Sequence, residues 1–176
     1  GPIYKTALMS DFDQLSVKEI EEELARLGGN ELIKTLEEFQ MHKNGDRVKP
    51  ATVAQDDFLA TYAHKINPED RMPNWKGSAY SLNLQIKALA YRQPVTVQID
   101  DLILHLLRGE VLNETQPDSI PGKILELRSQ GISVACGEGT LRITMVKLNR
   151  GQGKPMDIRA FINGYDNTLT TGMILG

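Results

Sequence analysis

Residues 121–143 read PGKILELRSQGISVACGEGTLRI, and this stretch decides the fold of the C-terminal part of the chain. Three short runs rich in Ile, Leu and Val are separated by glycines and polar residues. The runs are too short and too close together for helices to lie between them. The stretch therefore predicts an antiparallel meander, in which Gly137-Glu138-Gly139 forms a hairpin turn.

Two further runs extend the predicted sheet. Residues 95–99 alternate apolar and polar side chains, and residues 102–107 are nearly all apolar, with Asp100-Asp101 between them to turn the chain. This pattern predicts a β-hairpin. Residues 109–120 hold a further short strand and a polar loop.

The last long strand, residues 141–148, has an irregular pattern. Its apolar side chains change face between Met145 and Val146. A slip of one residue indicates a bulge or a strong bend, as where a strand turns the corner of a small barrel. We therefore expect an OB-like antiparallel β-barrel of about five or six strands with flanking helices, within a chain of the α+β class.

The N-terminal part predicts helices. Ser16 and Glu19 have the spacing of a capping box, and apolar residues then recur at helical intervals up to Gly28-Gly29, which we expect to end this helix. A second helix is expected over residues 30–41. Residues 42–57 are polar and lack helical periodicity, so they predict a linker before a domain over residues 58–176. Shorter helices are expected over residues 78–89 and 156–161.

Composition limits the function classes. With 176 residues, 40% hydrophobic and 24% charged, the chain is large enough for one ordinary domain or two small ones. Its one cysteine excludes an internal disulfide, which favours a reducing compartment, and we expect the cytoplasm of a bacterium, with an organelle as the alternative. No apolar run approaches the length of a membrane span, so no membrane partner is expected. The start, Gly1-Pro2, has no initiator Met and indicates a processed, tagged or excised chain.

The charge is unevenly distributed. Residues 1–50 carry seven basic and ten acidic side chains, whereas residues 120–176 carry seven basic and four acidic ones. The C-terminal part is thus the electropositive end, although a surplus of this size also serves ordinary solubility. Contact with nucleic acid remains one of two interpretations of this pattern.

The residues offer little for catalysis. The three histidines, His42, His64 and His105, lie in different predicted elements, and neither a nucleophile elbow nor a phosphate-binding P-loop is present. Cys136 lies on an apolar strand and is expected to be a buried, inert thiol. We expect no catalytic, cofactor-binding or metal-binding residue in this chain.

The segment Asn149–Pro155 joins the last long strand to the final predicted helix. The amides at a helix N-terminus can bind an anion, and Arg150 and Lys154 lie beside them in the sequence. A flexible basic loop is the alternative interpretation. Tyr62 and Trp75 could stack on bases, but we expect them to be core anchors.

Three blocks together resemble the C-terminal part of methionyl-tRNA formyltransferase. The first resembles the last helices of that family's catalytic domain, the second its signature after the interdomain linker, and the third its C-terminal barrel. They are residues 24–28 with 32–36; residues 61–66 with Glu69-Asp70, Asn74-Trp75 and Ser78-Ala79; and residues 121–122 and 132–143 with 153–156 and 161–164. Two departures occur: residues 90–94 replace the family's Asn-Pro-Trp-Pro-like stretch, and Asn74 replaces an Asp.

The resemblance implies an enzyme that transfers the formyl group of 10-formyltetrahydrofolate to the amine of methionyl initiator tRNA. The family keeps its Asn-x-His-x-Ser-x-Leu-Pro motif and its catalytic Asp in a Rossmann-like N-terminal domain, and this chain contains no Asn-x-His. We therefore expect residues 1–41 to be the end of a truncated catalytic domain, and the chain by itself to be inactive and to bind no cofactor. A related sugar N-formyltransferase, with a similar C-terminal positioning domain, is the alternative.

The resemblance also implies initiator methionyl-tRNA and the missing N-terminal catalytic domain as partners. The family's C-terminal domain helps to hold tRNA through a positively charged face, and the matching positions here are Lys154 and Lys65. Charge and placement add Lys147, Arg142 and Arg150. Their expected role is contact with tRNA phosphates, which positions the acceptor arm without reading sequence.

Overall fold

The computed structural model describes residues 1–12, 15–112, 119–150, 153–165 and 168–176. The chain divides into two compact units, Gly1–Lys65 and Ile66–Gly176. Each unit is described by itself below. Among the described residues, none of the helices combines the length and the apolar character that crossing a bilayer requires.

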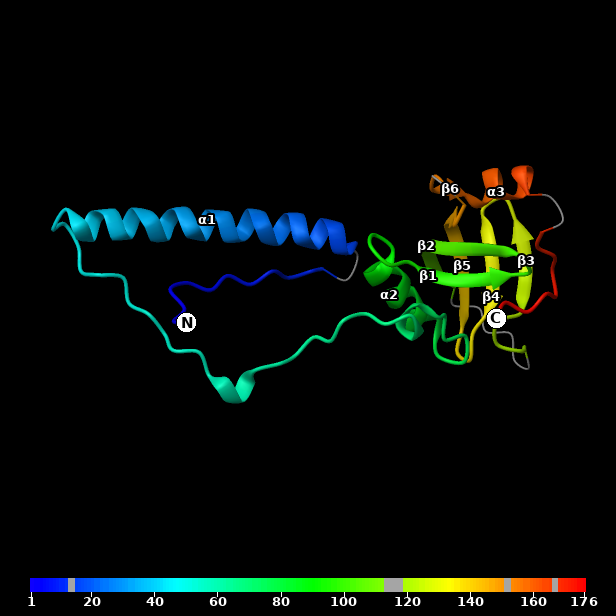
Figure 1. The fold of residues 1–176 in the computed structure, drawn as a ribbon, viewed down its shortest axis with the longest axis horizontal. Helices are drawn as coiled ribbons and strands as arrows, with labels where there is room; N and C mark the ends of the chain where they lie inside the picture. The colour runs from blue at the N-terminus through cyan, green and yellow to red at the C-terminus, as the bar shows by residue number, and fades with distance from the viewer. Residues whose placement is uncertain (13–14, 113–118, 151–152, 166–167) are drawn as a thin grey trace. The chain divides into compact units, whose positions relative to one another are not determined.

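The first unit is built on one long helix, α1 (Val17–Lys43), and not on the two expected helices (Figure 1). Its start is as expected: the Ser16 hydroxyl accepts from the Glu19 amide, and the Glu19 carboxylate accepts from the Ser16 amide. Gly28 and Gly29 do not end the helix, because neither has the positive φ of a glycine C-cap. A glycine inside a helix costs only about 1 kcal/mol relative to alanine, so a long helix can tolerate the pair.

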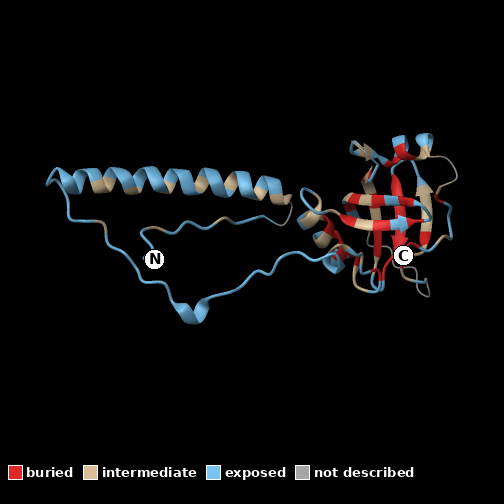
Figure 2. Ribbon diagram, viewed as in Figure 1, coloured by how far each residue is buried: buried red, intermediate tan, exposed pale blue. Residues whose placement is uncertain are grey.

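The N-terminal segment of this unit lies along α1. Ile3 pairs with Val53 in an isolated antiparallel bridge, the Tyr4 ring meets the Phe39 ring edge-on at 5.2 Å, and Lys5 forms an ion pair with Glu38 at 2.7 Å. A short 3₁₀-helix, η1 (Asp57–Leu59), follows. No described residue of α1 is buried, as the pale and tan helix in Figure 2 shows. Tyr62 is 86% exposed, so the expectation that it anchors a core is wrong.

The second unit contains a 3₁₀-helix, two α-helices and an antiparallel sheet. In chain order they are η2 (Glu69–Arg71), α2 (Ala79–Leu89), β1 (Val95–Ile99), β2 (Leu102–Leu112), β3 (Ile124–Arg128), β4 (Gly131–Ala135), β5 (Thr140–Leu148), β6 (Met156–Asp157) and α3 (Ile158–Gly164). The expected hairpin, meander and helix over residues 78–89 are confirmed. The final helix begins later than expected, because Met156 and Asp157 pair with β5 as a short strand.

The sheet has the order β1-β2-β5-β4-β3, with β6 paired to β5 beside this path. The expected OB-like barrel is not confirmed, because no ladder among the described strands joins β1 to β3 and the sheet stays open. The coarser expectation, an antiparallel sheet combined with helices, is correct. In Figure 1 the β1–β2 hairpin runs across the direction of β5, β4 and β3.

The irregularity predicted at Met145 and Val146 is present. Leu106 pairs with Val146 and Arg108 with Met145, so Leu107 is an extra residue in β2. Gly109 then pairs with Ile143, which leaves an extra residue in β5 as well. Bulges increase local twist and bend a sheet, which accounts for the change of direction along β2 and β5.

One hydrophobic core joins the sheet to the two α-helices, and Figure 2 shows its buried residues in red. From β5 it receives Leu141, Ile143, Val146 and Leu148, the two pairs on either side of the phase slip. Leu82 and Ile86 of α2 and Phe161 of α3 cover it. Trp75 is 7% exposed and belongs to this core, as expected.

The turn between β4 and β5 is bonded to the segment before α2. The Gly137 amide donates to the Trp75 carbonyl at 2.8 Å, and the Ala79 amide donates to the Glu138 carbonyl at 2.8 Å. A Cβ at Gly137 would lie 2.0 Å from the carbonyl oxygen of Lys76. Gly137 is therefore required by this close approach of two backbones.

The C-terminal tail closes the same side of the unit. The Leu175 amide donates to the Gly122 carbonyl at 2.9 Å, and the Ile124 amide donates to the Met173 carbonyl at 2.7 Å. Gly122 has φ +87°, and a Cβ there would lie 2.8 Å from the Leu175 carbonyl oxygen. Pro121-Gly122 thus starts the meander and also receives the tail beside Trp75.

Replacing Gly137 with alanine should destabilise the second unit by about 3 kcal/mol or more, because the added methyl group would force the two backbones apart. Thermal or urea unfolding of the whole chain measures this loss. Gly164→Ala is the matched control, since no atom lies within 4 Å of a Cβ at Gly164. Equal stability of the two variants would contradict the packing described here.

Candidate nucleic-acid interface

The described residues contain no group of three or more His, Cys, Asp or Glu side chains that could hold a metal ion. His42 and His64 lie in the first unit and His105 in the second. Asp100 occupies the hairpin turn with φ +50°, and the Asp56 carboxylate accepts from the Phe58 amide. These carboxylates therefore serve turns.

Cys136 is buried directly after β4, and burial raises the pKa of its thiol to about 11. A thiol is nucleophilic only as the thiolate, so Cys136 is unreactive at neutral pH. This agrees with the interpretation of Cys136 as an inert core residue.

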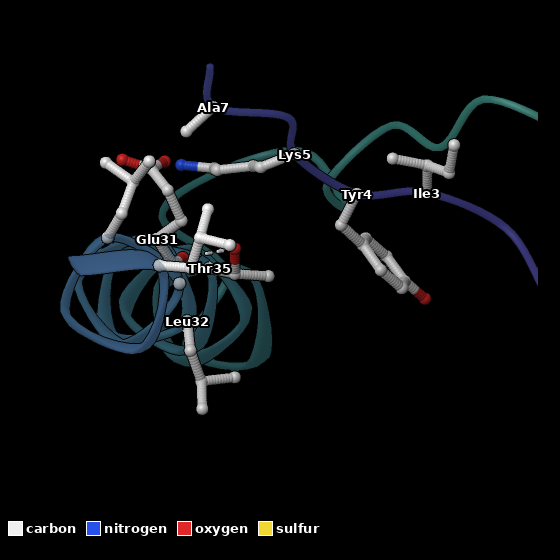
Figure 3. A pocket seen from close by; sticks show the side chains of 10 residues that line it. Ile3, Tyr4, Lys5, Ala7, Glu31, Leu32 and Thr35 are labelled. Atoms are coloured by element: carbon white, nitrogen blue, oxygen red, sulfur yellow. Dashed lines mark hydrogen bonds between the residues drawn. The ribbon is translucent and has the colours of Figure 1, made fainter. Parts of the chain in front are cut away.

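A groove of about 440 Å³ lies in the first unit between the N-terminal segment and α1 (Figure 3). Ile3, Tyr4 and Lys5 line one wall, and Glu31 and Leu32 belong to the other. The Lys5 ammonium is engaged by Glu38, and the remaining lining is mainly apolar. The groove offers an apolar surface and no nucleophile with an adjacent base.

The basic loop does not lead directly into the last helix. The residues after the basic loop form β6, and the Asp157 carboxylate caps α3 by accepting from the Ala160 amide at 2.7 Å. A carboxylate therefore already accepts from one of the amides at the N-terminus of α3. Within the loop, Gly151 and Gln152 lie outside the described residues.

Arg150 and Lys154 remain as exposed cations between β5 and β6. The Gly153 amide donates to the Arg150 carbonyl at 2.9 Å, and the side chains of Arg150 and Lys154 are both exposed. The exposure of these two cations agrees with the alternative interpretation of Asn149–Pro155 as a basic surface loop.

Arg142 and Lys147 alternate with buried residues of β5, so both face away from the core. The Arg142 guanidinium lies 4.0 Å from the Glu110 carboxylate on the neighbouring strand. Lys147 lies directly across from His105 of β2. Lys65 is exposed and ends the first unit, so it is described apart from these residues.

The sequence did not predict that Arg71 and Thr96 lie close to His105 and Lys147. Arg71 of η2 donates to the Pro94 carbonyl at 3.3 Å and to the Thr96 hydroxyl at 3.2 Å. Thr96 pairs with His105, which in turn pairs with Lys147. The alternation in residues 95–107 could have shown that Thr96 and His105 share a face, but only the strand order brings Lys147 beside them.

These cations affect the titration of His105. The pKa of its imidazole is lowered, first by burial and then by the charges of Arg71 and Lys147. A lowered pKa keeps the ring neutral at neutral pH.

Comparison with known proteins decides the family. The family model described as "Formyl transferase, C-terminal domain" matches residues 65–166. This chain belongs to that family. The formyltransferase C-terminal domain covers almost the whole sheet unit, and its match begins at Lys65.

Curated relatives of this formyltransferase C-terminal chain are named methionyl-tRNA formyltransferase. The protein from Rickettsia canadensis (strain McKiel) is 31% identical over 160 residues, 89% of this chain and 48% of the relative. The protein from Pseudomonas paraeruginosa (strain DSM 24068 / PA7) is 35% identical over 122 residues, 69% of this chain and 38% of the relative. The chain thus spans about half or less of these relatives.

Solved structures share the fold. A HypX variant from Aquifex aeolicus aligns with a TM-score of 0.55 and 14% identity, over 77% of this chain and 23% of that one. HypX from the same organism in complex with tetrahydrofolic acid aligns with a TM-score of 0.53 and 13% identity, over 73% of this chain and 22% of that one. At such identities the likeness concerns the fold alone.

Native Cys136 should react with iodoacetamide at pH 8 roughly 100-fold more slowly than in urea, because burial suppresses both the thiolate and access to it. Mass spectrometry of quenched samples measures the rates, with glutathione in each solvent as the reference. Comparable rates in the native and unfolded states would show that the thiol is exposed.

Proposed function

We propose that this chain is the C-terminal portion of a methionyl-tRNA formyltransferase and that it binds and positions initiator methionyl-tRNA. The observation that carries the proposal is 31% identity over 160 residues to a protein of that name. The parent enzyme would transfer a formyl group from 10-formyltetrahydrofolate to the methionyl amine, with both substrates reacting in the half of the relatives that this chain does not span. It would act in the cytoplasm of a bacterium, since the relatives compared here come from Rickettsia and Pseudomonas species.

The proposal gives each part of the chain a role. Residues 1–41 would be the end of the catalytic domain, residues 42–57 a linker, and residues 58–176 the tRNA-binding domain. The surface of α1 supports the first assignment: Leu24 and Leu36 are 48% and 57% exposed, and apolar patches of this kind are usually covered by a partner.

The proposed contacts to tRNA phosphates are Lys154, Lys65, Lys147, Arg142 and Arg150. The exposure of Arg150 and Lys154 supports their role, because a phosphate backbone can approach a loop at the surface. Arg142 is the weakest member, since Glu110 offsets part of its charge.

Lys154→Glu should weaken binding of initiator tRNA to the chain about tenfold and reduce the steepness of the salt dependence, because a phosphate contact is replaced by repulsion. Filter binding or fluorescence anisotropy, repeated at salt concentrations from about 50 to about 200 mM, measures both the affinity and its salt dependence. Lys18→Glu is the matched control: it makes the same charge change on α1, where Lys18 pairs with Glu22 at the surface. Absence of binding at low salt would contradict the proposal.

The chain alone should not formylate methionyl initiator tRNA in the presence of 10-formyltetrahydrofolate. The amine's attack on the formyl carbon needs a base and a polarising group, and the motif that would supply them is absent from this sequence. Acid-gel separation of the tRNA products measures turnover, with the full-length Pseudomonas relative as positive control. Turnover by the chain would place catalysis in the portion described here.

A further inference from the structure

Three nitrogen-bearing side chains, those of Arg71, His105 and Lys147, lie on or beside the outer face of β1, β2 and β5. Thr96, His105 and Lys147 are direct cross-strand neighbours on β1, β2 and β5. Directly opposite residues have Cβ atoms about 5 Å apart, so these side chains form one continuous row. Their strand neighbours on either side are buried, which places the row on the face away from the core.

Arg71 is held at one end of this row. Its Nε and one Nη donate to the Pro94 carbonyl and the Thr96 hydroxyl, which fixes the guanidinium beside β1. The guanidinium has five N–H donors, so further donors remain for a ligand. A fixed guanidinium loses less freedom on binding an anion than a mobile side chain does.

Arg71 and Lys147 lack the carboxylate partners that two other cations of the sheet, Arg128 and Arg142, have. Arg142 faces Glu110 and Arg128 pairs with Glu126, whereas neither Arg71 nor Lys147 has an ion pair within the part of the chain that the structure describes. Two acids on the adjoining elements make other hydrogen bonds. On η2 the Asp70 carboxylate accepts from the Asn67 amide, and on β6 the Asp157 carboxylate caps α3.

His105 lies between the two cations. Its Nε2 is buried and has no hydrogen-bond partner among the described residues. Burial, Arg71 and Lys147 together lower the pKa of the imidazole. An anion bound at the row would offset the repulsion from both cations and favour the protonated ring.

We propose that Arg71, His105 and Lys147 form a phosphate-binding site on the outer face of β1, β2 and β5, which binds more tightly when His105 is protonated. The site rests on the proposed function in one respect: its phosphate would belong to the tRNA backbone. Thr96 completes the site by holding Arg71. Binding and protonation are linked, so each phosphate bound would favour uptake of a proton by the imidazole.

The direct test follows the imidazole signals of the whole chain by NMR during a pH titration, with and without sodium pyrophosphate at constant ionic strength. Pyrophosphate should raise the pKa of His105 by about half a unit or more, because a bound anion favours the charged imidazole. Lys147→Gln should reduce the effect, whereas Arg128→Gln, which removes a charge already paired with Glu126, should not. An unchanged His105 titration would overturn the site.

The second test measures binding of initiator tRNA at pH 6 and pH 7.5. The wild-type chain should bind up to about twofold more tightly at the lower pH, which is the gain that a half-unit rise of a lowered pKa allows. His105→Gln should lose most of this gain, and His64→Gln should keep it. Arg71→Gln should weaken binding at both pH values. Thermal unfolding of each variant verifies that it is folded, and a folded His105→Gln with the full gain would contradict the proposal.

The outcomes separate the two proposals. If pyrophosphate shifts His105 but tRNA does not bind, the anion site stands and the proposed function fails. If tRNA binds in a Lys154-dependent manner while Arg71→Gln and His105→Gln change nothing, the proposed function stands and this site is wrong.

Discussion

The second unit depends on the backbone contact between the turn after β4 and the segment that leads into α2. Gly137 donates to the Trp75 carbonyl and Glu138 accepts from the Ala79 amide, so the turn of the meander fixes the entrance of the helix. Trp75 is held in the core by the same contact, with Gly122 packed against its ring. A side chain at position 137 would prevent this approach. The start of α2 and the position of Trp75 therefore both depend on Gly137.

The alternation of side chains along β1, β2 and β5 determines which residues lie on the outer face of the sheet. Each strand that contributes buried residues to the core must present the alternate residues to solvent, and on β1, β2 and β5 these include Thr96, His105 and Lys147. The nitrogen-bearing side chains of this face therefore come from three sequence segments, His105 from β2, Lys147 from β5 and Arg71 from η2. Pairing with carboxylates reduces the charge elsewhere on the sheet, as Glu110 does for Arg142. The net charge of a sequence segment does not show which of its cations are paired with carboxylates in the fold and which are not.

Local signals were readable from the sequence, and long-range ones were not. The capping box at Ser16, the hairpin turn at Asp100 and the phase slip at Val146 each depend on neighbouring residues, and all three are present. The glycine pair Gly28-Gly29 does not end the helix, because its backbone stays helical. The helix end for which anion binding was one of two interpretations is capped by Asp157, a contact that depends on where α3 begins. The proximity of His105 to Lys147 requires the strand order, which no periodicity contains.

The two irregularities between β2 and β5 compensate each other. Leu107 is the extra residue on one strand and Thr144 on the other, and the pairing of Gly109 with Ile143 restores the register that Leu106 and Val146 had. Loss of one residue from either strand would move every later side chain to the opposite face of the sheet. Loss of one residue from both would leave the faces as they are. During divergence, the lengths of these two strands are therefore constrained jointly, and a length change in one is tolerated only together with a matching change in the other.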